Sequence, residues 1–516
     1  MADNIRTFPV QCSGGLVDNV DPLTQSSGLP GSAIRLINYE PALRGGYRRL
    51  SGFANNYGTI PGDDANAAPA LGVAVYNGLN DGIFACRAPA SGNNYFHYWS
   101  NSLGDWVTPS TTGSPTMVGV TKVRFGKIGW YAPKLVMVDG VNPAGVWDGT
   151  TFSQITHSAA PDKPSLVEEF ASHIWLSGDP DEKTNLYFSA PLDESDFSPA
   201  NGAGVINVGF EIKQIKAFRD QLFIFGSNQI KRLTGSSAAD WVVRDVTKNL
   251  GTVAPDSVIE FNADLLFLGP DGVRPVSATD RIGDVELATV SKPIQGIFSQ
   301  YSSNEDLSTV TMVAVRKKSQ IRLFFADQEA LGIIGGVRGS GGSSVFEYSQ
   351  LVGMEVNCAD SGYLGDEEYV IHGDSVGRVF RQETGRTFNG LPIFSLYQTP
   401  FYFMDDPLIR KTYYDVTTFM KSEGVVSVNL GITFDYDDPT ISRESDFGIT
   451  TEGAASQWGT ATYDASDIYD GNPSPVRRTT FSGSGDSVSF TYVTTEEQES
   501  HTIQAIAVSY GLADRR

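Results

Sequence analysis

The chain has 516 residues, of which 40% are hydrophobic, 11% aromatic and 19% charged, a composition that excludes a globally disordered protein. Sixty acidic residues stand against 38 basic ones and give a net charge of −22, which argues against a protein that holds nucleic acid on a basic surface. No apolar run is long enough for a membrane-spanning helix, and the N-terminus lacks the apolar core of a signal peptide. The three cysteines are too scattered for a disulfide framework or a zinc site.

Residues 1–60 are predicted to form an N-terminal arm that is rich in glycine and arginine. Four arginines lie close together in this otherwise acidic chain: Arg35, Arg44, Arg48 and Arg49. Such a cluster is a candidate for contact with a partner protein, whose carboxylates would form charge-assisted pairs with it. The alternative is intramolecular, with the arginines neutralising nearby acids such as Glu40.

Residues 61–395 are predicted to form a series of short β-strands. Apolar runs rich in Val, Ile, Phe and Tyr recur between Gly, Asp, Asn or Pro, which is typical of strands and turns. Each run is followed by a turn and a second strand, and these units recur about every 35–50 residues. Examples of the apolar runs are Leu135–Val138, Ile174–Leu176, Leu222–Phe225, Leu265–Leu268 and Tyr369–His372.

This period is typical of the blades of a β-propeller, of which we count about seven between residues 70 and 390. A large β-sandwich is the alternative, but it has no such longer period. The pair Trp147-Asp148 does not recur, which excludes a WD40 protein. We therefore predict an all-β chain with a β-propeller over 61–395, and we expect the N-terminal segment to supply ring-closing strands. A short helical pattern at Val285–Ser299 is the exception.

Residues 396–516 leave this pattern. They contain longer strand patterns at Tyr413–Met420, Val425–Tyr436, Val488–Val493 and Thr502–Tyr510, separated by a polar stretch at 437–487. We predict a separate C-terminal β-sandwich with a long polar insertion.

The sequence contains no recognisable catalytic motif. It has no phosphate-binding Gly-x-x-x-x-Gly-Lys loop, no His-Glu-x-x-His pair and no Gly-x-Ser-x-Gly elbow. The five histidines stand apart, and the strand patterns around His173 and His372 indicate structural roles for both. We expect no enzyme activity and no cofactor. Carboxylates paired in space for glycoside hydrolysis are not visible in a sequence, and no particular pair is favoured.

Carboxylate-rich turns are more frequent than any catalytic pattern. A divalent cation needs several converging oxygen ligands, and none of these turns has the spacing of an EF-hand. Asx-turns, in which the side chain accepts a hydrogen bond from the backbone nearby, explain the acids more simply. The turns are Asp179–Glu182, Asp405-Asp406, Asp435–Asp438 and Asp464–Asp470.

The N-terminal arm is the most specific feature of the chain. It contains Gly14-Gly-Leu-Val-Asp-Asn-Val-Asp-Pro, then Gly31-Ser-Ala-Ile-Arg-Leu-Ile-Asn-Tyr-Glu, then Gly45-Gly-Tyr-Arg-Arg-Leu-Ser-Gly-Phe. Together with the segment Arg219–Gly235, this opening resembles the tail nozzle, or tail hub, proteins of short-tailed bacteriophages, whose relatives include the packaged-DNA stabilisation proteins. Only these two stretches carry the resemblance at residue level.

The resemblance implies a structural virion protein of the phage tail, made in the host cytoplasm. Copies of such proteins assemble into a closed ring, commonly a hexamer, below the portal and adaptor, and the ring is a conduit and seal for the packaged genome. The implied partners are identical subunits, the adaptor and portal complex, tail fibres or spikes, and genomic DNA in transit only. No membrane insertion is implied.

The negative charge of the chain would serve a function in such a conduit, because a negative lumen repels the phosphate backbone and lets DNA slide. Loops at the ends of elements can project into a lumen. The candidate channel-lining acids are Asp179, Asp181, Glu182, Asp405, Asp406, Asp435, Asp437 and Asp438. The candidate contacts with the adaptor or a neighbouring subunit are Arg35, Arg44, Arg48 and Arg49.

Two other functions stay open at this point. A receptor- or glycan-binding β-propeller of a phage tail would carry aromatic residues on its loop tips, and Tyr95–Trp99 is a candidate strip, although a core strand is the preferred interpretation of it. A glycan-cleaving propeller enzyme is the other alternative.

Overall fold

Strands dominate the protein. The computed structural model describes residues 5–90, 95–113, 119–277, 289–304, 306–326, 330–340, 343–404, 406–437, 445–451 and 476–512. The predicted all-β class is confirmed for these residues. Their α-helices are α1 (Pro22–Gly28) and α3 (Gln295–Asn304). The short 3-10 turns are η1 (Pro199–Asn201), η2 (Pro255–Ser257), η4 (Lys292–Ile294), η5 (Leu307–Thr309) and η6 (Arg316–Lys318).

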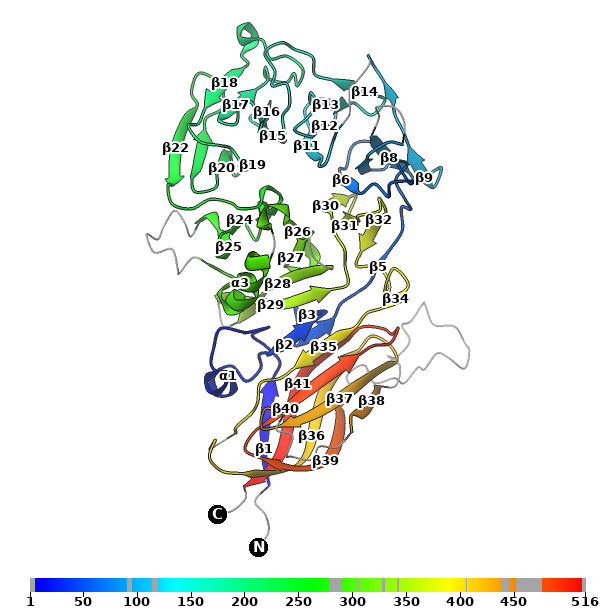
Figure 1. Ribbon diagram of the computed structural model, residues 1–516, viewed down its shortest axis with the longest axis vertical. Helices are drawn as coiled ribbons and strands as arrows, with labels where there is room; N and C mark the ends of the chain where they lie inside the picture. The colour runs from blue at the N-terminus through cyan, green and yellow to red at the C-terminus, as the bar shows by residue number, and fades with distance from the viewer. Residues whose placement is uncertain are drawn as a thin grey trace.

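The molecule is elongated, with a group of small sheets at one end and two large sheets at the other (Figure 1). Helix α3 falls in the segment for which a helical pattern was noted, although it begins only at Gln295 and extends past Ser299. Residues 285–288 of that pattern lie outside the described part of the chain.

Four antiparallel sheets open the group of small sheets, each with its strands in chain order. The first is β6 (Ala70–Val75), β7 (Ile83–Arg87), β8 (Phe96–Ser100) and β9 (Asp105–Val107). The second is β11 (Arg124–Ile128), β12 (Lys134–Val138), β13 (Gly145–Trp147) and β14 (Thr151–Gln154), with β10 (Ser110–Thr111) parallel to β14. The third is β15 (Leu166–Phe170), β16 (His173–Ser177), β17 (Asn185–Phe188) and β18 (Gly204–Asn207). The fourth is β19 (Gln214–Phe218), β20 (Gln221–Phe225), β21 (Ile230–Thr234) and β22 (Val242–Thr247).

Three further sheets complete the group. The fifth is β23 (Ile259–Phe261), β24 (Asp264–Gly269) and β25 (Gly272–Pro275). The sixth begins with β26 (Thr311–Val315), β27 (Gln320–Phe325), β28 (Leu331–Ser340) and β29 (Ser343–Val352). The seventh is β30 (Cys358–Leu364), β31 (Glu367–Gly373) and β32 (Val379–Gln382), followed by β5 (Phe53–Ala54), β33 (Thr387–Phe388) and β34 (Leu391–Pro392).

The first strands of the seven sheets, or the residues just before them, surround a common cavity, and most neighbouring first strands contact one another. Strand β6 contacts β30 and β11, β15 contacts β11 and β19, and β26 contacts β23 and β30. The second strand of each sheet is almost fully buried, as in β16, β20 and β27. Apolar side chains such as Phe84 and Met137 form a core between neighbouring sheets. The apolar runs of the sequence are mostly these second strands, because they are covered on both faces.

Three successive hairpins share one turn design. The first strands β15, β19 and β23 end in Phe170, Phe218 and Phe261, and two residues with positive φ follow each phenylalanine. Two-residue turns with positive φ match the twist of the paired strands. This design recurs at Ala171-Ser172, Arg219-Asp220 and Asn262-Ala263.

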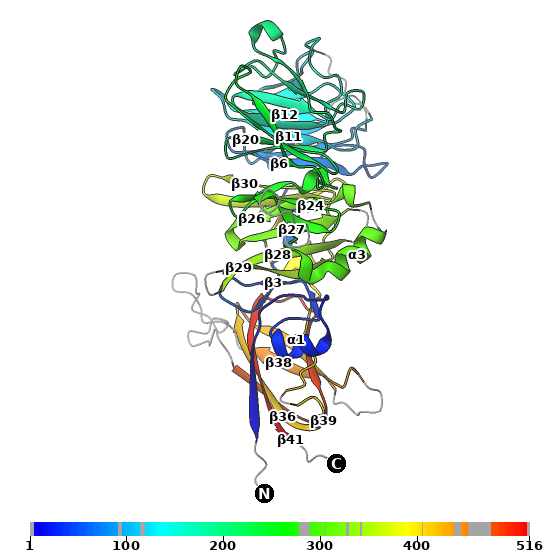
Figure 2. The same cartoon turned by 90° about the vertical axis from the view of Figure 1, so that its left-hand side faces the viewer.

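At the other end of the molecule, two large sheets pack face to face (Figure 2). One has the order β3 (Tyr39–Pro41), β4 (Tyr47–Arg49), β41 (His501–Leu512), β36 (Lys411–Ser422) and β39 (Val476–Gly485), and β1 (Arg6–Gln11) also pairs with β41. The other contains β35 (Ser395–Gln398), β40 (Val488–Thr494), β37 (Val426–Phe434) and β38 (Phe447–Thr451). Their inner faces share one core, in which Tyr413 packs on Phe434 and Phe481 on Phe490.

The N-terminal arm joins the two ends of the molecule. Strand β2 (Arg35–Ile37) pairs in parallel with β29 and antiparallel with β35, so the sixth small sheet and one large sheet form a single nine-stranded sheet. Strand β5 pairs with β32 of the seventh sheet, and β1 pairs with β41. The regions before and after residue 395 are therefore continuous through backbone hydrogen bonds, which a separate sandwich domain would not require.

Candidate functional site

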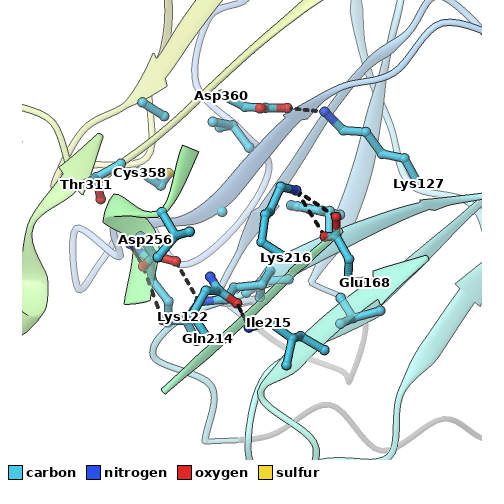
Figure 3. A pocket seen from close by; sticks show the side chains of 18 of the residues that line it. Lys122, Lys127, Glu168, Gln214, Ile215, Lys216, Asp256, Thr311, Cys358 and Asp360 are labelled. Atoms are coloured by element: carbon cyan, nitrogen blue, oxygen red, sulfur yellow. Dashed lines mark hydrogen bonds and ion pairs between the residues drawn. The ribbon is translucent and has the colours of Figure 1, made fainter. Parts of the chain in front are cut away.

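A charged cavity of about 420 Å³ lies at the centre of the seven small sheets. Its walls come from the first strand of each sheet, or from the residues just before it, and Figure 3 shows their side chains. Successive side chains of a strand point to opposite faces. Charged side chains reach the cavity from β11, β15, β19, η2 and β30, or from the residues just before them, whereas β6 and β26 are apolar and fully buried.

Asp256 of η2 is the centre of one ion pair set. Arg124 of β11 donates to Asp256 at 2.6 Å, and the Lys122 Nζ lies 3.4 Å from the same carboxylate. Lys122 also donates to the carbonyl of Asn357 at 2.9 Å. Burial alone would raise the pKa of Asp256, but the charges of Arg124 and Lys122 hold that pKa well below its usual range. The second, fifth and seventh sheets are thereby tied together.

Two further pairs cross the cavity wall. Lys216 of β19 lies 2.9 Å from Glu168 of β15, and Lys127 of β11 donates to Asp360 of β30 at 2.8 Å. Burial alone would lower the pKa of Lys216, but the Glu168 carboxylate raises it, so the ammonium stays charged. Each cation of the cavity therefore has a carboxylate partner, and the pairs bridge different sheets.

The rest of the lining is polar but poorly reactive. Gln214 donates to the carbonyl of Pro255 at 2.8 Å. Thr311 is buried, and its hydroxyl oxygen has no partner among the described residues. Burial raises the pKa of the Cys358 thiol to about 12, so this cysteine is not an activated nucleophile. The cavity thus has the chemistry of a structural ion-pair cluster with room for water.

No three His, Cys, Asp or Glu side chains gather closely enough to hold a metal ion in the part of the chain that the structure describes. Within the same residues, no helix has the length and apolar character needed to cross a membrane.

The predicted channel-lining acids are not brought together, and none of those described lines the cavity. Asp179 is buried and accepts hydrogen bonds from the backbone N–H groups of Lys163 and Asp181. Asp406 accepts from Leu408 N–H, and Asp435 from Ser487 N–H. Asp179 and Asp406 therefore cap turns, whereas Asp435 joins the end of β37 to the residue before β40.

The remaining predicted acids lie on the surface or outside the described residues. The side chain of Asp181 is 75% exposed and pairs with Lys163 at 3.1 Å. Glu182 and Asp437 are exposed. Asp405 and Asp438 lie outside the described part of the chain.

The arginine cluster is divided between the interior and the surface. Arg49 is fully buried and donates to the carbonyls of Gln498, Ile393 and Glu496. The prediction that Arg49 contacts the adaptor or a neighbouring subunit is wrong, because its guanidinium donates hydrogen bonds to backbone carbonyls inside the molecule.

Arg48 is also engaged within the chain. It donates to Glu40 at 2.9 Å and to Glu423 at 2.7 Å. The intramolecular alternative, in which the arginines neutralise acids such as Glu40, therefore describes Arg48. Arg35 and Arg44 are exposed.

Glu40 belongs to a buried charge cluster where the arm meets the sixth and seventh sheets. Its side chain is 2% exposed and lies 2.6 Å from the Lys318 Nζ and 3.6 Å from Arg322. Glu383 pairs with both Lys318 and Arg322. Burial alone would raise the pKa of Glu383, but these two cations hold it well below its usual range.

The aromatic strip and the histidines are structural. Tyr95 and Phe96 are buried at the start of β8, as a core strand requires. His97, His173, His372 and His501 are also buried. The preferred core interpretation of Tyr95–Trp99 therefore accounts for its first residues.

Sequence reasoning missed the charged residues of the cavity. A usable signal was present: Lys122–Lys127, Glu168-Glu169 and Lys216 each lie just before the apolar second strand of a unit. A charge that recurs at the same place in several repeat units indicates a shared site, but its partner could not be read from the sequence.

No family model matches the chain, and no curated protein matches it. Among solved structures, it is similar to the extracellular domain of a hybrid two-component system from B. thetaiotaomicron, with a TM-score of 0.38 and 10% identity, covering 64% of this chain and 40% of that one. It is also similar to Hsv2 of Kluyveromyces lactis, with a TM-score of 0.30 and 8% identity, covering 55% of this chain and 98% of that one. The chain spans less than half the length of the first of these structures. At these TM-scores the likenesses assign neither a family nor a function.

Proposed function

We propose that the chain is a structural subunit of a bacteriophage tail, a nozzle or hub protein that assembles into a closed ring below the portal and adaptor. The observation that carries the proposal is the N-terminal arm, because one of the two stretches that resemble the nozzle proteins joins the two ends of the molecule. A chain whose most specific sequence serves its own architecture is better suited to building a scaffold than to a catalytic task.

The glycines of the arm have a physical reason at this junction. Gly15 has a φ of +66°, and a Cβ there would lie 2.6 Å from the backbone nitrogen of Tyr348. Leu16 N–H donates to the Tyr348 carbonyl at 2.7 Å, and Gly14 N–H donates to Glu347 at 2.9 Å. Only glycine allows the arm to approach β29 this closely.

The finer fold assignment belongs to the same proposal. We assign a β-propeller to residues 61–395, because seven sheets surround one cavity, most of their neighbouring first strands are in contact, and β5 of the arm adds to the seventh sheet. A propeller closes in this way to remove an exposed edge. We assign a β-sandwich to residues 396–516, because two facing sheets share one core there.

The conduit in this proposal lies between subunits. Ion pairs such as Arg124–Asp256 bridge opposite walls of the cavity inside one chain, so a path for DNA needs a lumen that several copies enclose. A net charge of −22 on each copy favours a negative lumen, through which the phosphate backbone slides without binding. Arg35 and Arg44 remain the candidates for contact with the adaptor, since both are exposed.

Immunogold electron microscopy tests the proposal. Antibodies raised against the purified chain are applied to particles of the phage whose genome encodes it, and an irrelevant antibody serves as the control. We expect gold at the tail, next to the portal vertex. Gold on the capsid shell, or particles that lack the chain, would contradict the proposal.

A further inference from the structure

One face of the large sheets has an unusual composition for so acidic a chain. It is the face of the sheet formed by β1, β41, β36 and β39 that points away from the core, and we call it the outer face. Side chains alternate along these strands, so that Val10, Ile506 and Val416 point into the core while their neighbours lie on the outer face.

The pairing register aligns the outer side chains into rows across four strands. One row contains Gln11, Ala505, Phe419 and Val476. The next contains Pro9, Ala507, Thr417 and Arg478. Ala505, Ala507 and Thr417 in the middle of these rows are small, so a second surface can approach the sheet closely there.

Apolar side chains are exposed within the first row. Phe419 is 38% exposed, and Val476, its direct partner on β39, is 52% exposed. Paired apolar side chains gain free energy when a second surface covers them. Scattered apolar residues are common on protein surfaces, but adjacent ones in register form a patch.

The charge of the outer face differs from that of the chain. A third row contains Thr7, Ser509, Asp415 and Thr480. Asp415 is the one acid in these three rows, and it is buried and accepts from Arg478 at 2.7 Å and from Ser509 at 3.0 Å. Lys421 adds an exposed positive charge farther along β36. Two copies with a net charge of −22 repel each other, and this repulsion is smallest where acids are absent.

The edge of the sheet favours packing by the face over addition of a strand. Cys12 N–H donates to the Gln504 carbonyl, which continues the β1–β41 pairing, and the alternation of an antiparallel pair then directs the backbone of Pro9 away from β41. Proline has no N–H group to offer a further strand there.

We propose that the outer face is a contact surface between copies of this chain, occupied by the weakly charged surface of a neighbouring subunit. The contact deepens the proposed function and rests on it, since a closed ring needs one heterologous interface repeated around the axis.

Site-specific photo-crosslinking in assembled particles tests the contact. A benzoylphenylalanine replaces Thr417 on the outer face, and a matched probe replaces Val205, which is 52% exposed on the edge strand β18. We expect irradiation to link the Thr417 probe to peptides of the same chain in a second copy, with little linkage from the Val205 probe. Links only to another tail protein, no links, or equal links from both probes would overturn the inference while the location of the chain in the tail still stands. Particles that lack the chain would overturn the proposed function and the inference together.

A charge substitution gives a second readout. Thr417→Glu places a carboxylate at the centre of the outer face, where a covering subunit would bury it unpaired, and we expect an about tenfold lower yield of complete particles. The control Val242→Glu changes an exposed position of β22 that is 45% exposed, and it should leave the yield unchanged. Circular dichroism must show both variants folded. A normal yield from a folded Thr417→Glu variant contradicts the inference.

Discussion

Arg124 donates a hydrogen bond to Asp256 at 2.6 Å, although the two residues are 132 positions apart in the sequence. The pair joins the second sheet to the 3-10 turn that opens the fifth, and Lys122 adds a second cation to the same carboxylate. Asp256 therefore holds the start of β11 and the residue pair before it against the fifth sheet.

Asp256→Asn should therefore destabilise the chain. The substitution keeps the shape of the side chain but leaves Lys122 and Arg124 without a counter-charge. Both side chains of the Arg124–Asp256 pair are about one-fifth exposed, so we expect a loss of about 1–3 kcal/mol, less than for a fully buried pair. Urea denaturation measures it. The control Asp245→Asn removes an exposed pair with Lys248 and should cost under about 0.5 kcal/mol. Equal midpoints for both variants would contradict the assignment.

Glu40→Gln should lower the free energy of unfolding by more than the loss of a surface ion pair does. Its side chain is 2% exposed and faces Arg48, Lys318 and Arg322, so the amide would leave buried cations short of one charge. We expect a loss of about 3 kcal/mol in the free energy of unfolding. Glu497→Gln breaks a pair with Arg386 that is half exposed and serves as the control. A denaturation midpoint no lower for Glu40→Gln than for the control would show that the cluster does not stabilise the junction.

A comparison of Gly15→Ala with Gly45→Ala should separate the cost of a steric clash between the arm and β29 from the cost of a positive φ. Gly15 and Gly45 both have positive φ, but a Cβ on Gly15 meets the backbone of Tyr348, whereas a Cβ on Gly45 meets nothing within 4 Å. We expect a loss of about 1 kcal/mol for Gly45→Ala from the backbone conformation alone, and a clearly larger loss for Gly15→Ala. Thermal melts of the two variants measure the difference. The reverse order would be evidence against the close approach of the arm to β29.

The stability of the chain should fall between pH 7.5 and pH 5.5. Burial lowers the pKa of His97 to about 4 and of His372 and His501 to about 3, so these side chains stay neutral in the folded state at pH 5.5. The unfolded chain, in which histidine has a pKa of about 6.5, takes up about one proton at each of these histidines over this range. Burial also lowers the pKa of His173, which acts in the same direction. Folding stability is therefore complete above pH 6.5 and decreases as the pH falls, by about 1.4 kcal/mol for each histidine.

Urea midpoints at the two pH values, at constant ionic strength, check this dependence. His501→Gln should make the drop smaller by about 1.4 kcal/mol, because it removes one of the histidines that stay neutral in the folded chain. Burial raises the pKa of Glu347, which works in the opposite direction and makes the measured drop smaller. A midpoint that does not fall at pH 5.5 would contradict the buried, neutral state of these histidines.

The sequence predicted the local elements better than their long-range partners. Apolar runs such as Leu222–Phe225 and Leu265–Leu268 are strands, because a strand covered on both faces needs a continuous apolar run. The turns between the strands were visible for a similar reason, since Gly, Asn and Asp tolerate the backbone conformations of hairpins.

The partners of the arm and of the cavity residues could not be predicted. Strand β2 has three residues and pairs with β29 and β35, which lie more than 300 residues away, and no local pattern specifies such a register. Arg49 is a second example. The arginines close to it in the sequence suggested a contact on the surface, but the carbonyls that it binds come from distant segments. Charge in a sequence does not reveal which charges the fold buries.

Single-particle electron cryomicroscopy of the phage tail tests the central claim most directly. The account predicts a closed ring of identical copies of this chain below the adaptor, with the copies enclosing a lumen whose surface potential is mainly negative. A map in which the chain forms isolated copies at the tips of fibres, or a ring whose lumen is neutral or basic, would contradict it.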